Sequence, residues 1–156
     1  MKHLKLILLF CLCFPLVGNA QYGGTFTSSI TVNNLTIGTQ YTQTYLIASF
    51  GTPMYSSMSE FGLDEGYLYG NSFFRFAENG MFVGFVVRDN TFLVLEQYNG
   101  GIRIGDLISK VSLLGGIGWR LEAKPNGMYE LWMNDEVMYF KVESGRITFI
   151  SYDTSL

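Results

Sequence analysis

Two segments of this chain begin with an Ile-Gly-polar step, continue as a short run with helical spacing of apolar residues, and end at glycine. The first spans residues 37–51 (Ile-Gly-Thr to Phe-Gly) and the second spans residues 104–116 (Ile-Gly-Asp to Gly-Gly). Each is followed by a hairpin signal with glycine at its tip, at 79–80 and at 144–145. An internal repeat of this size constrains a fold more than any local pattern. It predicts an α+β fold of two tandem helix-plus-antiparallel-sheet repeats.

The first 20 residues have the pattern of an export signal. Lys2 and Lys5 give a basic start, residues 6–17 are apolar, and residues 18–20 (Gly-Asn-Ala) are the small residues that a signal peptidase reads. The apolar run is also shorter than the roughly 20 residues needed to span a bilayer. We therefore expect cleavage before Gln21, a periplasmic or extracellular location, and no membrane insertion after cleavage.

These observations divide the chain into three parts. Residues 1–20 are the expected signal peptide, residues 21–98 hold a lead segment and the first α/β repeat, and residues 99–156 hold the second α/β repeat. Removal of the signal takes away both cysteines and the only histidine, and it leaves 8 Lys and Arg against 13 Asp and Glu, a net charge of −5. The acidic balance argues against nucleic acid as a partner, because nucleic-acid binders carry clustered Lys and Arg.

The residue types that remain restrict the chemistry. A chain without His and Cys cannot build a Ser-His-Asp or Cys-His catalytic arrangement or the usual zinc site. Carboxylates are still present, and Asp64 with Glu65, or Glu60 with Asp64, could serve a glycosidase or a calcium site. Adjacent acids in a loop are more often simply solvated. We therefore expect no enzymatic activity, no cofactor and no metal.

Local patterns predict the elements of each repeat. In the first helix Thr39 is the expected cap, Tyr41, Tyr45, Leu46 and Ala48 form an apolar stripe, and Gly51 ends the helix. In the second helix Asp106 is the expected cap, and Leu107, Ile108, Val111 and Leu114 form one buried face. The expected strands, separated by tight-turn residues, are 66–69, 72–77, 81–88, 91–96, 119–124, 128–133, 136–142 and 146–152.

The turns also predict which side chains share a face. Two-residue turns at 79–80 and 144–145 would pair Phe74 with Phe85 and Phe140 with Phe149, and we assign these pairs to the face that the helices cover. Exposed Trp and Tyr beside a few charges are typical of binding hot spots. The candidate binding residues on the opposite face are Phe73, Arg75, Phe82, Glu130, Trp132, Tyr139, Lys141 and Tyr152. Leu68 and Ile150 are expected on the same face but are not among the candidates.

The order of these elements resembles the β-lactamase inhibitor protein superfamily. It also resembles the related single-unit lipoproteins of outer-membrane assembly, the SmpA/OmlA type. The residues that carry the likeness are Ile37, Gly38, Phe50, Gly51 and Pro53 in the first copy and Ile104, Gly105, Val111 and Gly116 in the second.

The resemblance implies two tandem units whose sheets join into one continuous antiparallel sheet with helices on one face. In the inhibitors the exposed, aromatic-rich face grips an enzyme. This chain departs from both families, because it lacks the disulfides of the inhibitors and the lipidated cysteine of the lipoproteins. The loop with which the inhibitors plug an active site does not align with residues 59–67, so no inhibitory residue is carried over. We expect a monomeric, exported, non-catalytic module that binds a protein through the open face of the sheet, with inhibition of a secreted or periplasmic enzyme as one form of this role. The alternative is a structural or assembly factor of the cell envelope.

Overall fold

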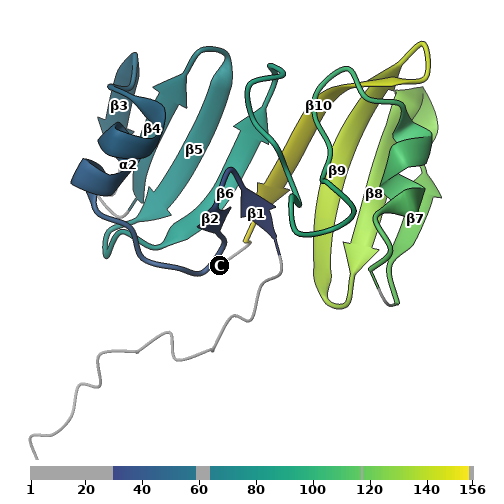
Figure 1. Ribbon diagram of the computed structural model, residues 1–156, viewed down its shortest axis with the longest axis horizontal. Helices are drawn as coiled ribbons and strands as arrows, with labels where there is room; N and C mark the ends of the chain where they lie inside the picture. The colour runs from purple at the N-terminus through teal and green to yellow at the C-terminus, as the bar shows by residue number, and fades with distance from the viewer. Residues whose placement is uncertain (1–29, 59–63, 117, 155–156) are drawn as a thin grey trace, which may run out of the picture.

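The computed structural model describes residues 30–58, 64–116 and 118–154. Their main feature is one antiparallel sheet of eight strands in the order β3-β4-β5-β6-β10-β9-β8-β7 (Figure 1). The strands are β3 (Tyr55–Met58), β4 (Asp64–Tyr69), β5 (Ser72–Ala77), β6 (Phe82–Val87), β7 (Arg120–Ala123), β8 (Met128–Met133), β9 (Glu136–Glu143) and β10 (Arg146–Asp153). The other described elements are the hairpin β1 (Thr31–Val32) and β2 (Leu35–Thr36), the α-helix α2 (Gln43–Phe50), and the 3₁₀ helices η1 (Ile108–Leu113) and η2 (Pro125–Gly127).

The two faces of the sheet have different surroundings. Helix α2, the β1–β2 hairpin and η1 all lie on one side of the sheet, which we call the core face (Figure 1). Among the described residues, no helix or strand covers the other side, which we call the open face. The side chains of the core face alternate with those of the open face along each strand, as in β5, where Ser72, Phe74 and Phe76 are buried and Phe73 and Arg75 are half-buried.

Aromatic rings fill the core beneath α2. Phe74 lies at the centre of this cluster, with its ring centroid 4.9 Å from that of Phe92 and 5.8 Å from that of Phe50. Phe74 also makes an edge contact with Tyr69 at 5.9 Å. Offset and edge contacts of this kind add to the free energy gained by burying the rings. The cluster therefore fixes α2 on β4 and β5 through Phe50, the last residue of the helix.

The residues expected to form a strand at 91–96 pair outside the sheet instead. Val94 makes isolated bridges with Val32 and Ile102, and the backbone N–H of Leu95 donates to the carbonyl oxygen of Thr31 at 2.8 Å. Asn33 adopts a left-handed backbone conformation in the two-residue turn of the β1–β2 hairpin, and its side-chain oxygen accepts from the N–H of Leu93 at 2.6 Å. The segment thus ties the hairpin down over the core face.

The first helix begins later than predicted. Its N-cap is Thr42, whose Oγ1 accepts from the N–H of Tyr45 at 3.2 Å, and Gly51 ends it as expected. Thr39 cannot serve as the cap because its carbonyl oxygen accepts from the N–H of Phe82 at 2.9 Å, which ties this segment to the start of β6. The helix keeps eight residues, and Leu46 is the one that is buried.

The second predicted α-helix is a 3₁₀ helix. Ile108 is half-buried, and Val111 and Leu114 are buried, which is a spacing of three residues and matches the three residues per turn of a 3₁₀ helix. Leu107 is 52% exposed and does not belong to the buried face. The apolar pattern therefore fits the tighter helix, with Leu107 outside it.

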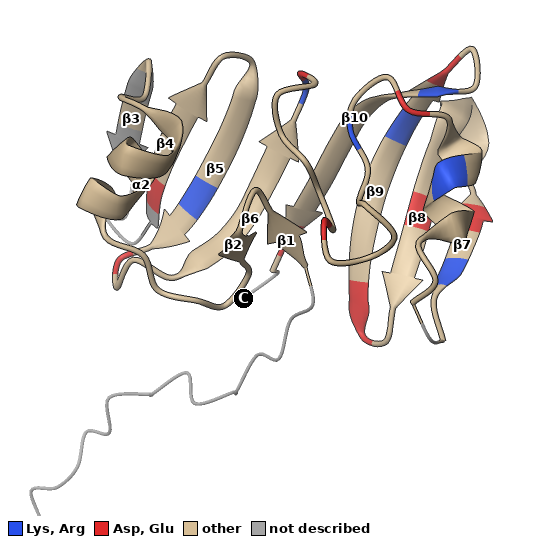
Figure 2. Ribbon diagram, viewed as in Figure 1, with Lys and Arg blue, Asp and Glu red and all other residues tan. Residues whose placement is uncertain are grey.

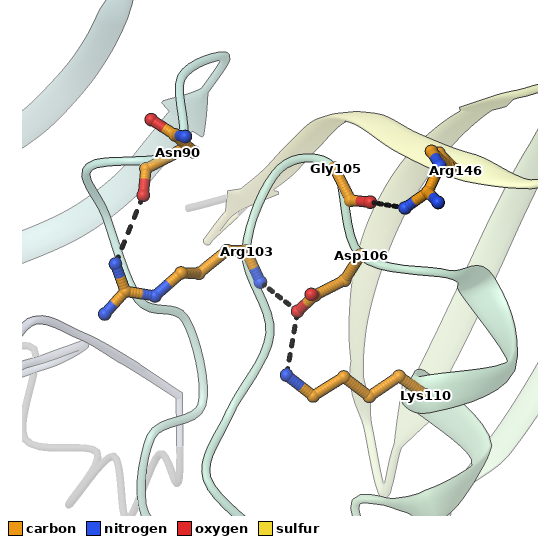
Figure 3. A network of polar contacts seen from close by, with 6 residues as sticks. All are labelled: Asn90, Arg103, Gly105, Asp106, Lys110 and Arg146. Carbon is orange, nitrogen blue, oxygen red and sulfur yellow. Dashed lines mark hydrogen bonds and ion pairs between the residues drawn. The ribbon is translucent and has the colours of Figure 1, made fainter.

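Asp106 forms a turn before η1 and does not cap it (Figure 3). Its Oδ2 accepts from the backbone N–H of Arg103 at 2.9 Å and from Nζ of Lys110 at 2.8 Å. Burial raises the pKa of this carboxyl, but the hydrogen bonds and charges of Lys110 and Arg103 outweigh burial and hold the pKa below its ordinary value. In the same region Arg146 donates to the carbonyl oxygen of Gly105 at 2.7 Å.

The prediction of two helix-plus-sheet repeats is therefore wrong. The α+β assignment is also wrong, because the described chain is mostly β-structure, with α2 as its one α-helix and an eight-stranded antiparallel sheet. The sequence reasoning also missed strand β3, which pairs with β4 and forms one edge of the sheet.

Candidate functional site

A row of side chains runs straight across the open face. The members of the row are direct cross-strand neighbours from β4 to β7: Leu68, Phe73, Val86, Ser151, Tyr139, Glu130 and Glu122. The row is apolar at its β4 end and acidic at its β7 end. Tyr139 lies between these parts and, among the residues of the face whose exposure the structure describes, is the most exposed aromatic one, at 42%.

Trp132 lies next to this row and is held on two sides. It is the cross-strand neighbour of Arg120 on β7, whose guanidinium carbon lies 5.7 Å from the centroid of the Trp132 ring. The indole Nε1 donates to Oε2 of Glu130 at 3.2 Å. The cation–π contact and the hydrogen bond together fix the orientation of a half-buried indole ring.

A second arginine stacks on an aromatic ring at the other side of the row. The guanidinium carbon of Arg88 lies 5.1 Å from the centroid of the Phe149 ring. Phe149 is also the cross-strand neighbour of Lys141, whose Nζ donates to the carbonyl oxygen of Asn126 in η2. The open face therefore presents aromatic rings whose positions are set by neighbouring cations.

Ion pairs link β7 to β8 on the same face, and Figure 2 shows the charged residues that these strands carry. Nζ of Lys124 lies 2.9 Å from Oε2 of Glu122 and 3.0 Å from Oε2 of Glu130, and Arg120 pairs with Glu122 at 2.8 Å. The hydrogen bond from Lys124 lowers the pKa of Glu122, and the hydrogen bonds to Glu122 and Glu130 raise the pKa of Lys124. Groups that exchange protons in catalysis need a pKa near the working pH. These shifts move both groups away from it, so they act as fixed charges.

Two of the predicted binding residues lie on the core face and not on the open face. The structure places Phe73, Arg75, Glu130, Trp132, Tyr139 and Lys141 on the open face. Phe82 and Tyr152 belong to the core, at 0% and 4% exposure, and Ile150 is buried with them. The hydroxyl of Tyr152 donates to Oε1 of Glu136 at 2.8 Å.

Register shifts explain both errors. Phe74 pairs with Phe85 as predicted, but a shift between Arg75 and Phe76 makes Phe76 pair with Phe82. A second shift between Ile147 and Phe149 makes Phe140 pair with Ile150 and not with Phe149. A shift of one residue moves every later side chain to the opposite face. It therefore buries Phe82 and Tyr152 and brings Phe149 to the open face.

Sequence reasoning missed other members of the open face. Val86, Val137, Arg88, Arg120 and Glu122 were not among the candidates. Arg120 and Glu122 could have been found, because both lie in the predicted strand 119–124, opposite Trp132 and Glu130 across the turn at 125–127. Phe149 could not, because no residue type in 146–149 marks the bulge.

The candidate acidic sites give little further chemistry. Glu60 lies outside the described residues, and Glu65 accepts a hydrogen bond from the hydroxyl of Tyr67. Within the described ranges, no group of three or more His, Cys, Asp or Glu residues is placed to hold a metal ion. In those ranges no helix is both long and apolar enough to cross a membrane.

Comparisons with known proteins returned no match to any family model, curated protein or solved structure.

Proposed function

We propose that the protein is a non-catalytic binding module that recognises another protein through the open face. The observation that carries this proposal is the placement of Trp132 and Tyr139 on adjacent strands of a face that no described helix or strand covers. Trp, Tyr and Arg are the residues that most often supply the binding energy of protein interfaces. Trp132 and its stacked Arg120 combine two of these types.

The contacts of Trp132 also support the proposal. A side chain that is ordered before binding loses less conformational entropy when a partner arrives. The stacked Arg120 and the acceptor Glu130 order the indole in the free protein. Inhibition of an enzyme outside the cytoplasm is one form of this function, and the export expected from residues 1–20, which lie outside the described part, would place the protein there.

A capture experiment tests the proposal. The tagged protein is incubated with an extract of the cell envelope and with culture medium, and bound proteins are identified by mass spectrometry. We expect that the double variant Trp132→Ala/Tyr139→Ala loses a partner that the wild-type protein captures. Leu113→Ala is the matched control, because Leu113 lies on η1, on the other side of the sheet, and is 65% exposed.

The identity and behaviour of the captured protein separate the possible roles. A hydrolase whose activity falls when this protein is added would support inhibition. A component of envelope assembly would favour the structural role. A partner that the double variant retains and Leu113→Ala loses would place the binding site on the core-face side and contradict the proposal.

A further inference from the structure

We infer that the protein self-associates, with strand β3 of one copy pairing antiparallel with β3 of a second copy. This inference concerns the end of the sheet opposite β7 and does not depend on the open face. It rests on three features of that end of the molecule: a sheet edge, the absence of charged residues from β3 and α2, and exposed apolar side chains on and next to α2.

The first feature is the edge itself. β3 is the last strand of the sheet at this end, and in the part of the chain that the structure describes it has a strand neighbour on one side only, β4. The free side of an edge strand presents unpaired N–H and C=O groups, which are complementary to another strand. A second strand is therefore the occupant that such an edge fits best.

The second feature is the absence of charge. The sequence contains no Asp, Glu, Lys, Arg or His between Leu6 and Ser59, so β1, β2, α2 and β3 carry none. Figure 2 shows α2, β1 and β2 without a single charged residue, whereas β7 and β8 at the far end carry several. Proteins commonly protect sheet edges with charged side chains. The edge strand β7 has Arg120 and Glu122 for this purpose, and β3 has no equivalent.

The third feature is the outer surface of α2, which lies at the same end of the sheet as β3 (Figure 1). Tyr45 is 44% exposed, Ile47 is 40% exposed, and Met54, just after the helix, is 75% exposed. Tyr45 stacks on Tyr41 with ring centroids 5.3 Å apart, and the hydroxyl of Tyr41 accepts from the N–H of Thr36 at 2.8 Å. The exposed ring of Tyr45 therefore stacks on the ring of Tyr41, which this hydrogen bond holds in place.

These features favour a second copy over other occupants. The chain has a net charge of −3, so two copies repel each other wherever their charged surfaces meet. The surface formed by β3 and α2 carries no charge itself, and the nearest charge on the adjacent strand is Glu65, the cross-strand neighbour of Met58, so two copies oppose fewer charges here than at the β7 end. Antiparallel pairing of β3 with itself is an isologous contact, which closes after two copies. The contact also brings the two α2 helices to the same side of the joined sheets, where their exposed apolar side chains can be covered.

Sedimentation equilibrium of the full chain as recovered from the cell tests the inference. Over about 1 μM to about 1 mM, a range that covers weak and moderate association, we expect a reversible monomer–dimer equilibrium. Added salt should strengthen it, because salt screens the repulsion between the negatively charged copies and no ion pair is formed in the contact.

Single substitutions locate the contact. Ser56→Lys places a charge in the middle of β3, where it meets the same charge on the second copy, and it should raise the dissociation constant by about tenfold or more. Ser56→Asp should do the same, and an equimolar mixture of the two variants should associate again because opposite charges then meet. Ala123→Lys, which places a lysine on the exposed Ala123 of the other edge strand, is the control and should leave association unchanged.

A second variant keeps the test decisive if changes in β3 disturb the fold. Ile47→Glu on α2 should weaken the dimer to a similar degree, and Leu113→Glu on η1 should not. Circular dichroism and the urea midpoint show whether each variant is folded. A wild-type protein that stays monomeric throughout the concentration range would overturn the inference. A dimer that neither Ser56→Lys nor Ile47→Glu weakens would overturn it as well.

Discussion

Arg75 on β5 and Asp153 on β10 form an ion pair across the intervening strand β6, and the residue between them in the cross-strand register is Gly84. Because glycine has no side chain, the arginine can lie along the open face and reach the carboxylate two strands away. A Cβ atom at Gly84 would lie 3.0 Å from the carbonyl oxygen of Tyr152 and 3.5 Å from Cγ of Asp153. The pair links the two four-stranded halves of the sheet at the β6–β10 junction.

A double-mutant cycle measures this link. Arg75→Ala, Asp153→Ala and the double variant should show a favourable coupling of about 0.2–1 kcal/mol in urea unfolding, which is the usual range for an ion pair that stays partly exposed. In a Gly84→Ala background the same cycle should give a smaller coupling, because the added methyl group would press on the carbonyl oxygen of Tyr152 and on the Asp153 side chain and displace the carboxylate. A coupling that is unchanged by Gly84→Ala would show that the glycine does not serve this purpose.

The packing of η1 gives a matched pair of substitutions. Val111 is 2% exposed and Leu107 is 52% exposed, although both belong to the apolar face that the sequence predicts. Val111→Ala should lower the free energy of unfolding by about 1–3 kcal/mol, since it leaves a cavity in the core. Leu107→Ala should change it by less than about 0.5 kcal/mol. Equal effects in urea unfolding would mean that the 3₁₀ register of η1 is incorrect.

Alkaline pH should destabilise the fold through Tyr67. Burial, and then the hydrogen bond to the Glu65 carboxylate, raise the pKa of Tyr67 from 10.0 to about 12. Below pH 10 the hydroxyl is protonated in both the folded and the unfolded chain, so its contribution to stability is fully present. From pH 10 to about 12 the unfolded chain loses this proton first, and the contribution is progressively lost.

Urea unfolding at two pH values tests this linkage. Between about pH 9 and about pH 11, Tyr67 should account for a loss of about 1 kcal/mol of wild-type stability. Tyr67→Phe should show a loss that is smaller by this amount, even if its stability at about pH 9 is lower because the hydrogen bond to Glu65 is gone. The same pH dependence in both proteins would contradict the assignment to Tyr67.

Local chemistry made much of the sheet predictable. The predicted strands 72–77 and 128–133 coincide with β5 and β8, because apolar alternation bounded by Asn and Gly turns identifies a hairpin without further context. Tyr139 and Trp132 were assigned to the correct face for the same reason, since the turn at 134–135 sets the register of β8 and β9 directly.

The incorrect predictions arise where contacts between segments that are distant in the sequence determine the local structure. The bulge beside Phe82 lies in a nearly continuous apolar run, 81–87, and the bulge beside Phe149 lies where two apolar residues, Phe149 and Ile150, are adjacent. In neither run does an alternating pattern show which side chains face the core. The helix expected from Thr39 is shortened because residues 38–41 pair with the β5–β6 hairpin, a contact between segments about 40 residues apart. Strand β3 has no alternating apolar pattern and is recognised only by its pairing with β4.

The two faces of the sheet predict opposite effects for two aromatic residues that the sequence grouped together. Trp132 is half-buried on the open face, whereas Tyr152 is 4% exposed in the core, with its ring centroid 6.2 Å from that of Phe85. Trp132→Ala should therefore lower the free energy of unfolding by less than about 1 kcal/mol. Tyr152→Ala should lower it by about 3 kcal/mol or more, as is usual when a large buried ring is removed.

Binding should show the reverse order if the open face is the recognition surface. Once a partner has been captured, Trp132→Ala should weaken the complex by about 2 kcal/mol or more, because anchors of this type carry much of the energy of an interface. Tyr152→Phe keeps the buried ring and removes only the hydroxyl that donates to Glu136, so it should bind like the wild-type protein. Isothermal titration calorimetry on the purified pair distinguishes the two effects. Full affinity in Trp132→Ala would move the binding site away from β8 and β9, and weak binding by a fully folded Tyr152→Phe would place it on the core-face side.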